Sequence, residues 1–371
     1  MHRAKSIAAV VPARYKPIEF WESEVPPVPA GGVNVEVTMA GVCGTDLHIY
    51  KGDIGMDFAH VLGHEGIGRI TELGEGVSKD HAEKTIVVGD LIYWCPMRPC
   101  HACYSCTVRH DFPSCPHGGA FTDAHGPTAA SYTRIATLPS TISFYKVEPT
   151  CPPEAVIALG CALPAALQGF DHLGGIPLDS TVVIQGAGAI GLAAVMLCKL
   201  ASARKVIVIE ANPMRLDMAR RFGATDTINL REYSSIDERV EKVKEITDAP
   251  GVDIVIEATG RLEAFEEGIK LLQRMGRYLL IGMWAGEGKG AVDPFQIVRK
   301  ALRIIGTTYA APRHYFQAMK LAEMYHERFP LVDCVTHKFP LKKTLQAFEA
   351  INRGDAVKVV IEPIEDDSVK P

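Results

Sequence analysis

Half of the ten cysteines in this chain lie in one stretch of 23 residues, YWCPMRPCHACYSCTVRHDFPSC. A tetrahedral Zn²⁺ binds four thiolates at about 2.3 Å, and short C-x2-C steps let a single loop supply several of them. Four of the cysteines have the spacing C-x2-C-x2-C-x8-C, and they are Cys100, Cys103, Cys106 and Cys115. The spacing predicts a closed structural zinc site. Cys95 lies outside the repeat and is expected to remain an unliganded neighbour.

Disulfide bonds are the other ordinary use of clustered cysteines. The N-terminal MHRAKSIAAVVPARYKPIEF is not a secretory signal, because its apolar stretch is short and runs into Pro12, Arg14 and Lys16. We therefore expect a cytoplasmic protein, in a reducing compartment that disfavours disulfides. A secreted disulfide scaffold is also usually much shorter than this chain. Both arguments favour metal binding.

Composition excludes other classes of protein. The 371 residues carry a formal net charge of −5, which gives no attraction to nucleic acid. No apolar run approaches the roughly 20 residues that a membrane span needs. Hydrophobic residues make up 47% and charged residues 22%, as in ordinary globular proteins. The length suffices for two domains.

The segment VVIQGAGAIGLAAV contains G-x-G-x-x-G as Gly186, Gly188 and Gly191, with a strand pattern before it and a helix pattern after it. In this context the first glycine permits a tight turn, the second lets the backbone approach a pyrophosphate, and the third lets helix and strand pack closely. The phosphates would meet the unpaired N–H groups at the helix N-terminus. The pattern predicts a dinucleotide site.

Glu210 ends the next predicted strand, nineteen residues after Gly191. A carboxylate at this place accepts hydrogen bonds from the adenosine ribose hydroxyls and repels a 2′-phosphate, so it favours NAD. Arg215 either contacts the adenosine end of the cofactor or faces solvent, and the sequence leaves both open.

A second group of possible metal ligands lies upstream, in AGVCGTDLHIYKG and HVLGHEGIG. Cys43 supplies a thiolate and His64 an imidazole, and a catalytic zinc typically has three protein ligands with a fourth position open. The third ligand must come from elsewhere in the chain. Spacing alone does not choose among Cys151, Cys161 and Cys198.

These residues need a scaffold, and the hydrophobic pattern predicts an α/β protein with two domains. KSIAAVV, VNVEVTMAGV, GIGRITELGEGV, TIVVGDLIYW and SYTRIATLP predict short strands of a partly open, Greek-key β-barrel. PEAVIALGCALPAALQGFDHL follows as a predicted helix. Six strands then alternate with helices, which indicates a doubly wound parallel sheet. They are Val182–Gln185, Val206–Ile209, Thr227–Asn229, Ile254–Glu257, Tyr278–Ile281 and Arg303–Gly306.

After Thr307 we expect two more helices and a strand, VKVVIEP, that return to the first domain. The predicted boundaries are 1–162 with 309–371 for the catalytic domain, and 163–308 for the dinucleotide-binding domain.

GVCGTDLH, GHE, the four-cysteine loop and GAGAIG occur in an order that resembles the zinc-dependent medium-chain alcohol dehydrogenase family of the medium-chain dehydrogenase/reductase superfamily. The resemblance covers nearly the whole chain. It implies a GroES-like catalytic domain, a Rossmann cofactor domain, and two zinc ions per chain. By position it assigns the catalytic zinc to Cys43, His64 and Cys161, and it adds Glu65, which approaches or replaces a ligand in relatives.

The resemblance also implies roles for three candidate catalytic residues. Thr45 lies two residues from Cys43, and His48 three further on, so they could pass the alcohol proton to solvent. Asp46 matches the carboxylate that orients the zinc-ligand histidine, although an ordinary turn aspartate is the alternative. Pocket candidates by analogy are Ile54, Trp94, Cys95 and Pro96, and GGAFTDAHGPTAASY is a candidate for the entrance of the pocket.

The sequence therefore predicts an NAD-dependent zinc alcohol dehydrogenase that interconverts a small alcohol with an aldehyde or ketone, as a homodimer or homotetramer. Two alternatives stay open. One is a polyol or amino-alcohol dehydrogenase of the same family, and the other is a non-catalytic zinc- and NAD-binding relative. The substrate itself is not readable.

Overall fold

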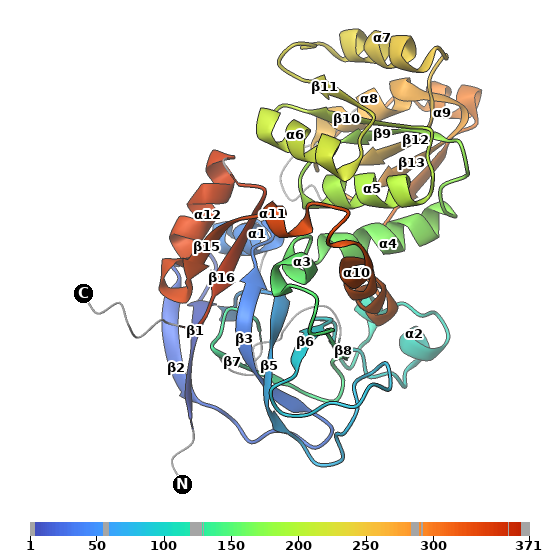
Figure 1. Ribbon diagram of the computed structural model, residues 1–371. Helices are drawn as coiled ribbons and strands as arrows, with labels where there is room; N and C mark the ends of the chain where they lie inside the picture. The colour runs from blue at the N-terminus through green and yellow to red at the C-terminus, as the bar shows by residue number, and fades with distance from the viewer. Residues whose placement is uncertain are drawn as a thin grey trace. The chain divides into compact units, whose positions relative to one another are not determined.

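The computed structural model describes residues 4–54, 59–118, 128, 130–282, 289–290, 292–354 and 356–364. The chain forms two compact units (Figure 1). The first contains Met1–Cys161, Ala311–His326 and Leu331–Pro371, and the second contains Ala162–Ala310 and Glu327–Pro330. Within the described ranges we find no helix with the length and apolar character that a bilayer span requires.

The second unit is built on one parallel sheet of six strands in the order β11-β10-β9-β12-β13-β14. Its strands are β9 (Thr181–Gln185), β10 (Lys205–Glu210), β11 (Asp226–Asn229), β12 (Val252–Glu257), β13 (Leu272–Leu280) and β14 (Arg303–Gly306). Numbered within the sheet, this is the order 3-2-1-4-5-6 of a dinucleotide-binding fold. All six predicted strands are confirmed.

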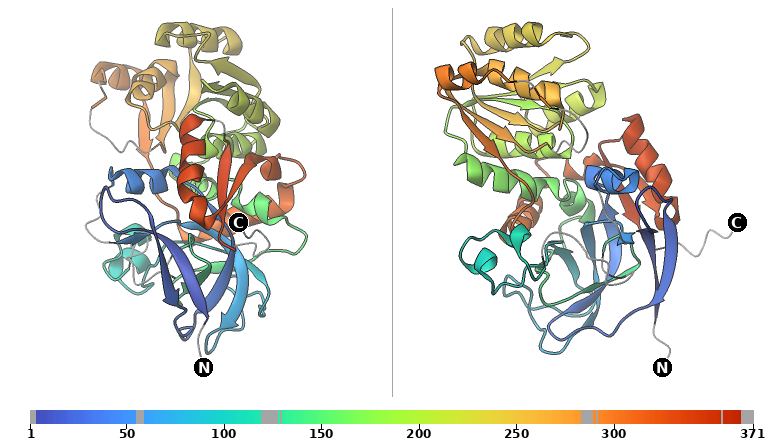
Figure 2. Two further views of the ribbon diagram at one scale, coloured as in Figure 1. Left: turned by 90° about the vertical axis from the view of Figure 1, so that its left-hand side faces the viewer. Right: turned by 180° about the vertical axis from the view of Figure 1, so that it is seen from behind.

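Helices cover both faces of this sheet (Figure 2). They are α4 (Ala162–Leu173), α5 (Ala189–Leu200), α6 (Pro213–Phe222), α7 (Ile236–Thr247), α8 (Leu262–Leu271) and α9 (Pro294–Lys300). Because both faces are covered, the central strands are apolar throughout, and Val182, Val208 and Ile256 are fully buried. The strand order reverses between β9 and β12, which places a ligand crevice at their carboxyl ends.

The first unit is built on two sheets with largely antiparallel pairing. One has the order β15-β16-β3-β5-β6-β8 with β7 also on β3, and the other has the order β2-β1-β4. The strands are β1 (Lys5–Val11), β2 (Glu19–Glu24), β3 (Val33–Gly41), β4 (His60–Val61), β5 (Glu65–Leu73), β6 (Leu91–Trp94), β7 (Ile135–Leu138), β8 (Phe144–Lys146), β15 (Val335–Pro340) and β16 (Lys358–Glu362).

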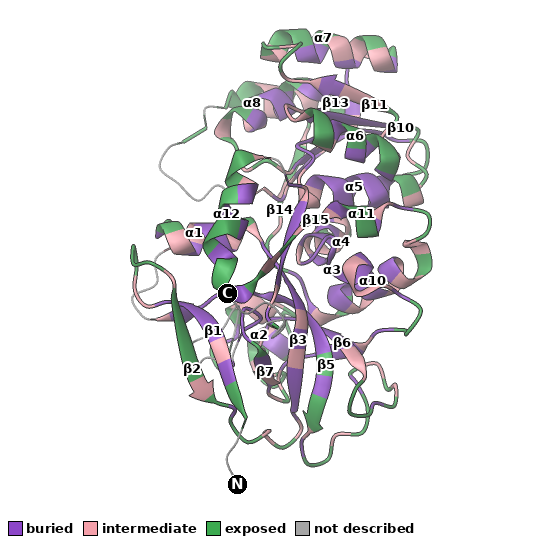
Figure 3. Ribbon diagram, turned by 60° about the vertical axis from the view of Figure 1, so that its left-hand side comes forward, coloured by how far each residue is buried: buried purple, intermediate pink, exposed green. Residues whose placement is uncertain are grey.

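One core joins these sheets. Val11 of β1, Val35 of β3 and Phe144 of β8 belong to the same buried cluster. In Figure 3, β3 is mostly buried, whereas β2 is mostly exposed. The helices and turns of this unit are α1 (Gly44–Lys51), α2 (Tyr104–Thr107), η1 (Phe112–Ser114), α3 (Pro153–Ile157), α10 (Pro312–Tyr325), α11 (Leu331–Cys334), η2 (Leu341–Lys343) and α12 (Thr344–Arg353).

Two sequence predictions need correction. The single helix expected across PEAVIALGCALPAALQGFDHL is split into α3 and α4, because Gly160 adopts a left-handed backbone with φ of +43°. After Thr307 the prediction missed α11 and β15. β15 has the sequence VTHKFP, which is polar and contains only one aliphatic residue, so the pattern did not indicate a strand.

Candidate functional site

Four side chains from distant parts of the first unit converge. Cys43 follows β3 and is the N-cap of α1, His64 and Glu65 meet at the start of β5, and Cys161 lies after α3. Each offers one ligand atom, and these four atoms all lie within 4.8 Å of one another. The structure therefore brings together the predicted ligand set, and it distinguishes Cys161 from Cys151 and Cys198, which are outside the group.

The spacing of the two sulfur atoms fits a metal ion. The Sγ atoms of Cys43 and Cys161 are 3.6 Å apart. Two Zn–S bonds of about 2.3 Å at the tetrahedral angle put the sulfurs about 3.8 Å apart. A disulfide would need about 2.05 Å. The two cysteines are therefore arranged as two ligands of one metal ion and not as a disulfide bond.

Asp46 connects the loop of Cys43 to that of His64. It is 1% exposed, and its Oδ1 lies 3.2 Å from His64 Nδ1. The same carboxylate accepts from the backbone N–H of Cys43 (3.0 Å) and of Gly63 (3.2 Å), and from the Tyr132 hydroxyl (3.3 Å). Burial alone would raise the pKa of Asp46, but the His64 charge and these donors lower it. With Nδ1 held by Asp46, His64 has Nε2 for coordination.

The pKa values of the two cysteines are shifted in opposite directions. A hydrogen bond from the Cys161 thiol holds the pKa of Cys43 well below its ordinary value, and His64 adds to this against the effect of burial. The same hydrogen bond, with burial, raises the pKa of Cys161. The surroundings of Cys43 thus favour its thiolate form, and its place at the N-terminus of α1 suits a negative charge.

The residues predicted to move a proton lie on α1. The Thr45 hydroxyl is 3.7 Å from the Cys43 sulfur. His48 is one helical turn further on, and its Nδ1 lies 2.8 Å from Asp53 Oδ2. Both partners of this pair are about one third exposed. Asp53 was not among the predicted site residues, although it follows His48 by five residues, just after the helix end at Gly52.

Glu65 is held in a buried ion pair. Its Oε2 lies 2.5 Å from the Nζ of Lys358, on β16, and its Oε1 accepts from the backbone N–H of Cys161 at 2.9 Å. Burial would raise the pKa of Glu65, but the Lys358 charge outweighs it and the net shift is downward. Nothing in the sequence marked Lys358, because it lies in an apolar strand pattern far from GHE.

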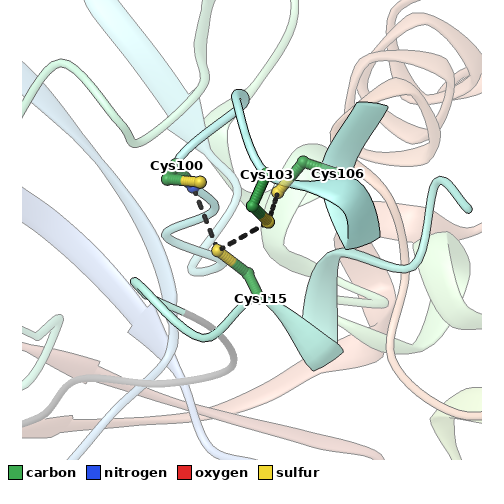
Figure 4. Close-up of side chains that lie close together, drawn as sticks. All are labelled: Cys100, Cys103, Cys106 and Cys115. Carbon is green, nitrogen blue, oxygen red and sulfur yellow. Dashed lines mark hydrogen bonds between the residues drawn. The ribbon is translucent and has the colours of Figure 1, made fainter. Parts of the chain in front are cut away.

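The four-cysteine loop closes on itself (Figure 4). Cys103 Sγ lies 3.5 Å from Cys106 Sγ and 3.8 Å from Cys115 Sγ, and Cys115 Sγ accepts from the backbone N–H of Cys100 at 3.3 Å. Hydrogen bonds to the Cys100 sulfur, the strongest from the backbone N–H of Ala102, lower the pKa of Cys100 to about 6. Burial raises the pKa of Cys106 to about 12. The sulfur spacings again match a tetrahedral ion.

Cys95 stands outside both groups in the described chain. It is fully buried, and burial raises the pKa of its thiol to about 12. Among the other pocket candidates, Ile54 is half-buried, and the buried Trp94 packs against Gly66. Most of GGAFTDAHGPTAASY, residues 119–127 and 129, lies outside the described residues.

The glycine loop of the second unit connects β9 to α5. Gly186 has φ of +93°, which a side chain rarely adopts. A Cβ on Gly191 would lie 2.0 Å from the Gly186 carbonyl oxygen, so helix and strand are in close contact there. A Cβ on Gly188, the N-cap of α5, would meet nothing within 4 Å. The backbone therefore offers its N-terminal N–H groups on an open side.

Glu210 ends β10 and hydrogen-bonds to the backbone of the glycine loop. Its carboxylate accepts from the backbone N–H of Ala187 (2.9 Å), Ala211 (2.7 Å) and Asn212 (3.0 Å). These contacts with the loop add to the predicted contact with a ribose, and they arise only in the folded chain. Arg215 lies half-buried in the first turn of α6.

Two basic residues, Arg204 and Lys205, lie at the far end of β10 from Glu210. Lys205 begins β10, and a strand of this length rises about 3.3 Å per residue, so its Cα lies about 16 Å from that of Glu210. Lys205 and Arg204 also have acidic neighbours, Asp226 at 3.3 Å and Asp179 at 3.6 Å.

Comparisons with known proteins give one family. Residues 29–146 match the alcohol dehydrogenase GroES-like domain, and residues 189–324 match the zinc-binding dehydrogenase domain. The chain is 42% identical over 355 residues to 5-exo-hydroxycamphor dehydrogenase of Pseudomonas putida, covering 95% of this chain and 98% of that protein. It is 30% identical to S-(hydroxymethyl)glutathione dehydrogenase of Escherichia coli, covering 96% and 99% of the two chains.

A solved structure agrees with these matches. An alcohol dehydrogenase from Thermotoga maritima superposes with a TM-score of 0.88 at 30% identity, covering 97% of this chain and all of that one. The first unit thus has the GroES-like fold and the second the Rossmann fold, as predicted.

Proposed function

Since the chain belongs to the zinc-dependent medium-chain alcohol dehydrogenase family and is an alcohol oxidoreductase, we propose that it transfers a hydride between an alcohol carbon and NAD at the Cys43 site. Its substrates are small alcohols and carbonyl compounds. The observation that carries the proposal is the convergence of four ligand atoms within 4.8 Å, with Asp46 hydrogen-bonded behind His64.

The first unit supplies the catalytic metal ligands. Cys43, His64 and Cys161 would hold a zinc ion, which would supply Lewis-acid polarisation of a carbonyl or alcohol group. Asp46 fixes the tautomer and ring orientation of His64, and it also holds the backbone N–H of Cys43. Because Lys358 holds Glu65, the other three residues would be the metal ligands, and a fourth position would be left for substrate.

The chain's own hydroxyl and imidazole carry the alcohol proton. Thr45 lies beside the Cys43 sulfur and accepts the proton first, and His48 exchanges it with solvent. Asp53 accepts a hydrogen bond from His48 Nδ1, which leaves Nε2 as the basic nitrogen. The partial exposure of both His48 and Asp53 suits exchange with water.

The second unit supplies the cofactor site. The backbone of Gly186, Gly188 and Gly191 receives the pyrophosphate at the N-terminus of α5. Glu210 accepts from the adenosine ribose hydroxyls and selects NAD, with Arg215 near the adenosine end. The remoteness of Arg204 and Lys205 supports NAD over NADP, because they lie at the start of β10.

The second zinc is structural. Cys100, Cys103, Cys106 and Cys115 surround one position with four sulfurs, which leaves no place for a substrate.

The substrate class that the comparisons favour is a secondary alcohol on a bulky alicyclic ring. The relative with 42% identity is named for 5-exo-hydroxycamphor, a bicyclic secondary alcohol, whereas the hydroxymethylglutathione enzyme is 30% identical. The test is NADH formation at 340 nm with 5-exo-hydroxycamphor, cyclohexanol, ethanol, sorbitol, threonine and S-(hydroxymethyl)glutathione. A preference for sorbitol or threonine would favour the polyol or amino-alcohol alternative. Turnover of none of the panel would leave a non-catalytic relative as the better description.

We also propose a homodimer or homotetramer joined through the cofactor unit. β14 ends the six-stranded sheet, and within the described chain it pairs only with β13. Next to it in sequence, α9 exposes Phe295 (63%) and Val298 (77%). An unpaired edge beside exposed apolar residues is a surface that a second copy can cover. Light scattering after size exclusion gives the oligomeric state, and a monomer would contradict this part.

A further inference from the structure

The peptide bond between Gly160 and Cys161 is held at both ends by buried side chains. The Tyr93 hydroxyl donates to the Gly160 carbonyl oxygen at 3.1 Å. The N–H of the same peptide group, on Cys161, donates to Glu65 Oε1 at 2.9 Å. Tyr93 is 1% exposed and Glu65 is 2% exposed, so water does not compete for either bond.

Both side chains come from a rigid part of the first unit. Tyr93 lies on β6 and Glu65 begins β5, and these strands pair through Ile67 and Tyr93. Glu65 is further held by Lys358, which itself donates to the Val42 carbonyl at 3.2 Å. The sheet therefore presents a donor and an acceptor to the two ends of one peptide group.

The peptide needs such support because it lies between helices. α3 ends at Ile157 and α4 begins at Ala162, so no continuous helical ladder fixes the orientation of Cys161. Gly160 has φ of +43°, and a Cβ there would lie 2.1 Å from Glu65 Oε2. Glycine permits this break, and a buried tyrosine hydroxyl in an apolar strand is costly unless it has a partner.

We propose that Tyr93 is a positioning residue for the metal ligand Cys161, acting with Glu65 to hold the Gly160–Cys161 peptide so that the thiol meets Cys43 before the metal arrives. The inference rests on the proposed function, because it takes Cys161 as a zinc ligand. Tyr93 acts through the backbone, because its hydroxyl donates to the Gly160 carbonyl oxygen.

The test is Tyr93→Phe, which removes one buried hydroxyl and keeps the ring. Its matched control is Tyr315→Phe. Tyr315 is 4% exposed, its ring centroid lies 5.6 Å from that of Tyr93, and its hydroxyl has no hydrogen bond within the described chain. Both variants and wild type are loaded with zinc, and release of zinc to a chromogenic chelator is followed over time.

We expect Tyr93→Phe to release one of its two zincs about 10–100-fold faster than wild type, the range for loss of a group that orients a ligand. Tyr315→Phe should match wild type. Equal release from wild type and Tyr93→Phe would overturn the inference, and so would equal acceleration by both variants, since that would reflect general loosening. Cys161→Ala separates the two proposals: if it still binds two zincs, the proposed ligand set is wrong, whereas if it loses one, only the role of Tyr93 is in question.

Amide hydrogen exchange of the wild type gives a second test that does not depend on a variant folding. If Tyr93 and Glu65 hold the peptide, the Cys161 amide should exchange slowly both with zinc and after chelation. Rapid exchange only after chelation would show that the metal, and not the two side chains, holds the peptide.

Discussion

The ammonium group of Lys358 lies 2.5 Å from the carboxylate of Glu65, although 293 positions separate the two residues in the chain. Their side chains are 4% and 2% exposed. Removing one partner of a buried pair leaves the other as an uncompensated charge, which costs more than the pair contributes. The interaction therefore couples the last strand of the first unit to the start of β5.

Lys358→Met should lower the free energy of unfolding by about 3–5 kcal/mol, because it leaves the Glu65 carboxylate buried without its cation. The control is Lys338→Met on the neighbouring strand β15, where the lysine is 41% exposed and contacts Glu154 and Glu362. It should cost at most about 1 kcal/mol. Urea denaturation measures both. Similar losses in the two variants would show that Lys358 has no special role.

The same pair makes a prediction about pH. Burial would lower the pKa of Lys358, but the charge of Glu65 and nearby thiolates raises it above 10.5, and the pKa of Glu65 is lowered from 4.5. The lysine therefore contributes to the stability of the folded state below pH 10.5, and this contribution is lost as the pH rises through its folded pKa. The glutamate contributes to stability above pH 4.5, and its contribution is lost as the pH falls through its folded pKa. In Lys358→Met the burial of Glu65 is no longer opposed by the lysine charge, so its pKa should rise and it should take up a proton as the pH falls. The loss of stability caused by Lys358→Met should therefore be the same at pH 8 and pH 10 and smaller at pH 6. A smaller loss at pH 10 than at pH 8 would contradict the assignment.

The two cysteine groups should behave differently when one ligand is removed. Elemental analysis should find two zincs per wild-type chain and one in both Cys103→Ser and Cys161→Ala. Because the four-cysteine loop has no open position, Cys103→Ser should mainly lower the melting temperature. Cys161→Ala should abolish turnover and leave NAD binding, measured by fluorescence, unchanged. Loss of hydride transfer in a Cys103→Ser protein that melts like wild type would mean that the two sites have been exchanged.

Glu210 offers a test that separates charge from loop support. Glu210→Gln keeps an acceptor oxygen for the N–H of Ala187 but loses the charge, whereas Glu210→Ala loses both. Two unit charges 4 Å apart interact by about 4 kcal/mol at an effective dielectric of 20, and even a quarter of that is about fivefold in rate. Both variants should therefore reduce the NAD⁺/NADP⁺ ratio of kcat/KM by about fivefold or more. Only Glu210→Ala should also raise the KM for NAD⁺ strongly. An unchanged ratio in both would exclude Glu210 as the selector.

The local hydrophobic pattern was sufficient to predict the strands of the cofactor unit. The strands around Gly186 and Glu210 are apolar and short, and turn residues separate them from amphipathic helices, so periodicity identified all six. The cysteine loop was equally local, because its four ligands lie within sixteen residues.

Contacts between distant segments could not be predicted in this way. No local signal pairs Glu65 with Lys358, or the Tyr93 hydroxyl with the Gly160 carbonyl. The break at Gly160 was hidden because the residues on both sides fit a helical pattern, and it follows from the left-handed backbone of Gly160, where the Glu65 carboxylate occupies the space of a Cβ. The choice of Cys161 as third ligand likewise needed the family resemblance.

The position of β16 sets an order for biosynthesis. β16 pairs with both β3 and β15 and carries Lys358, so the largest sheet of the first unit cannot close until residue 362 has left the ribosome. The parallel sheet of the second unit is complete once β14 has emerged, some fifty residues earlier. Domains generally fold as units during translation. The nucleotide-binding sheet can therefore form while the first unit still lacks β16, and with it the lysine that pairs with Glu65.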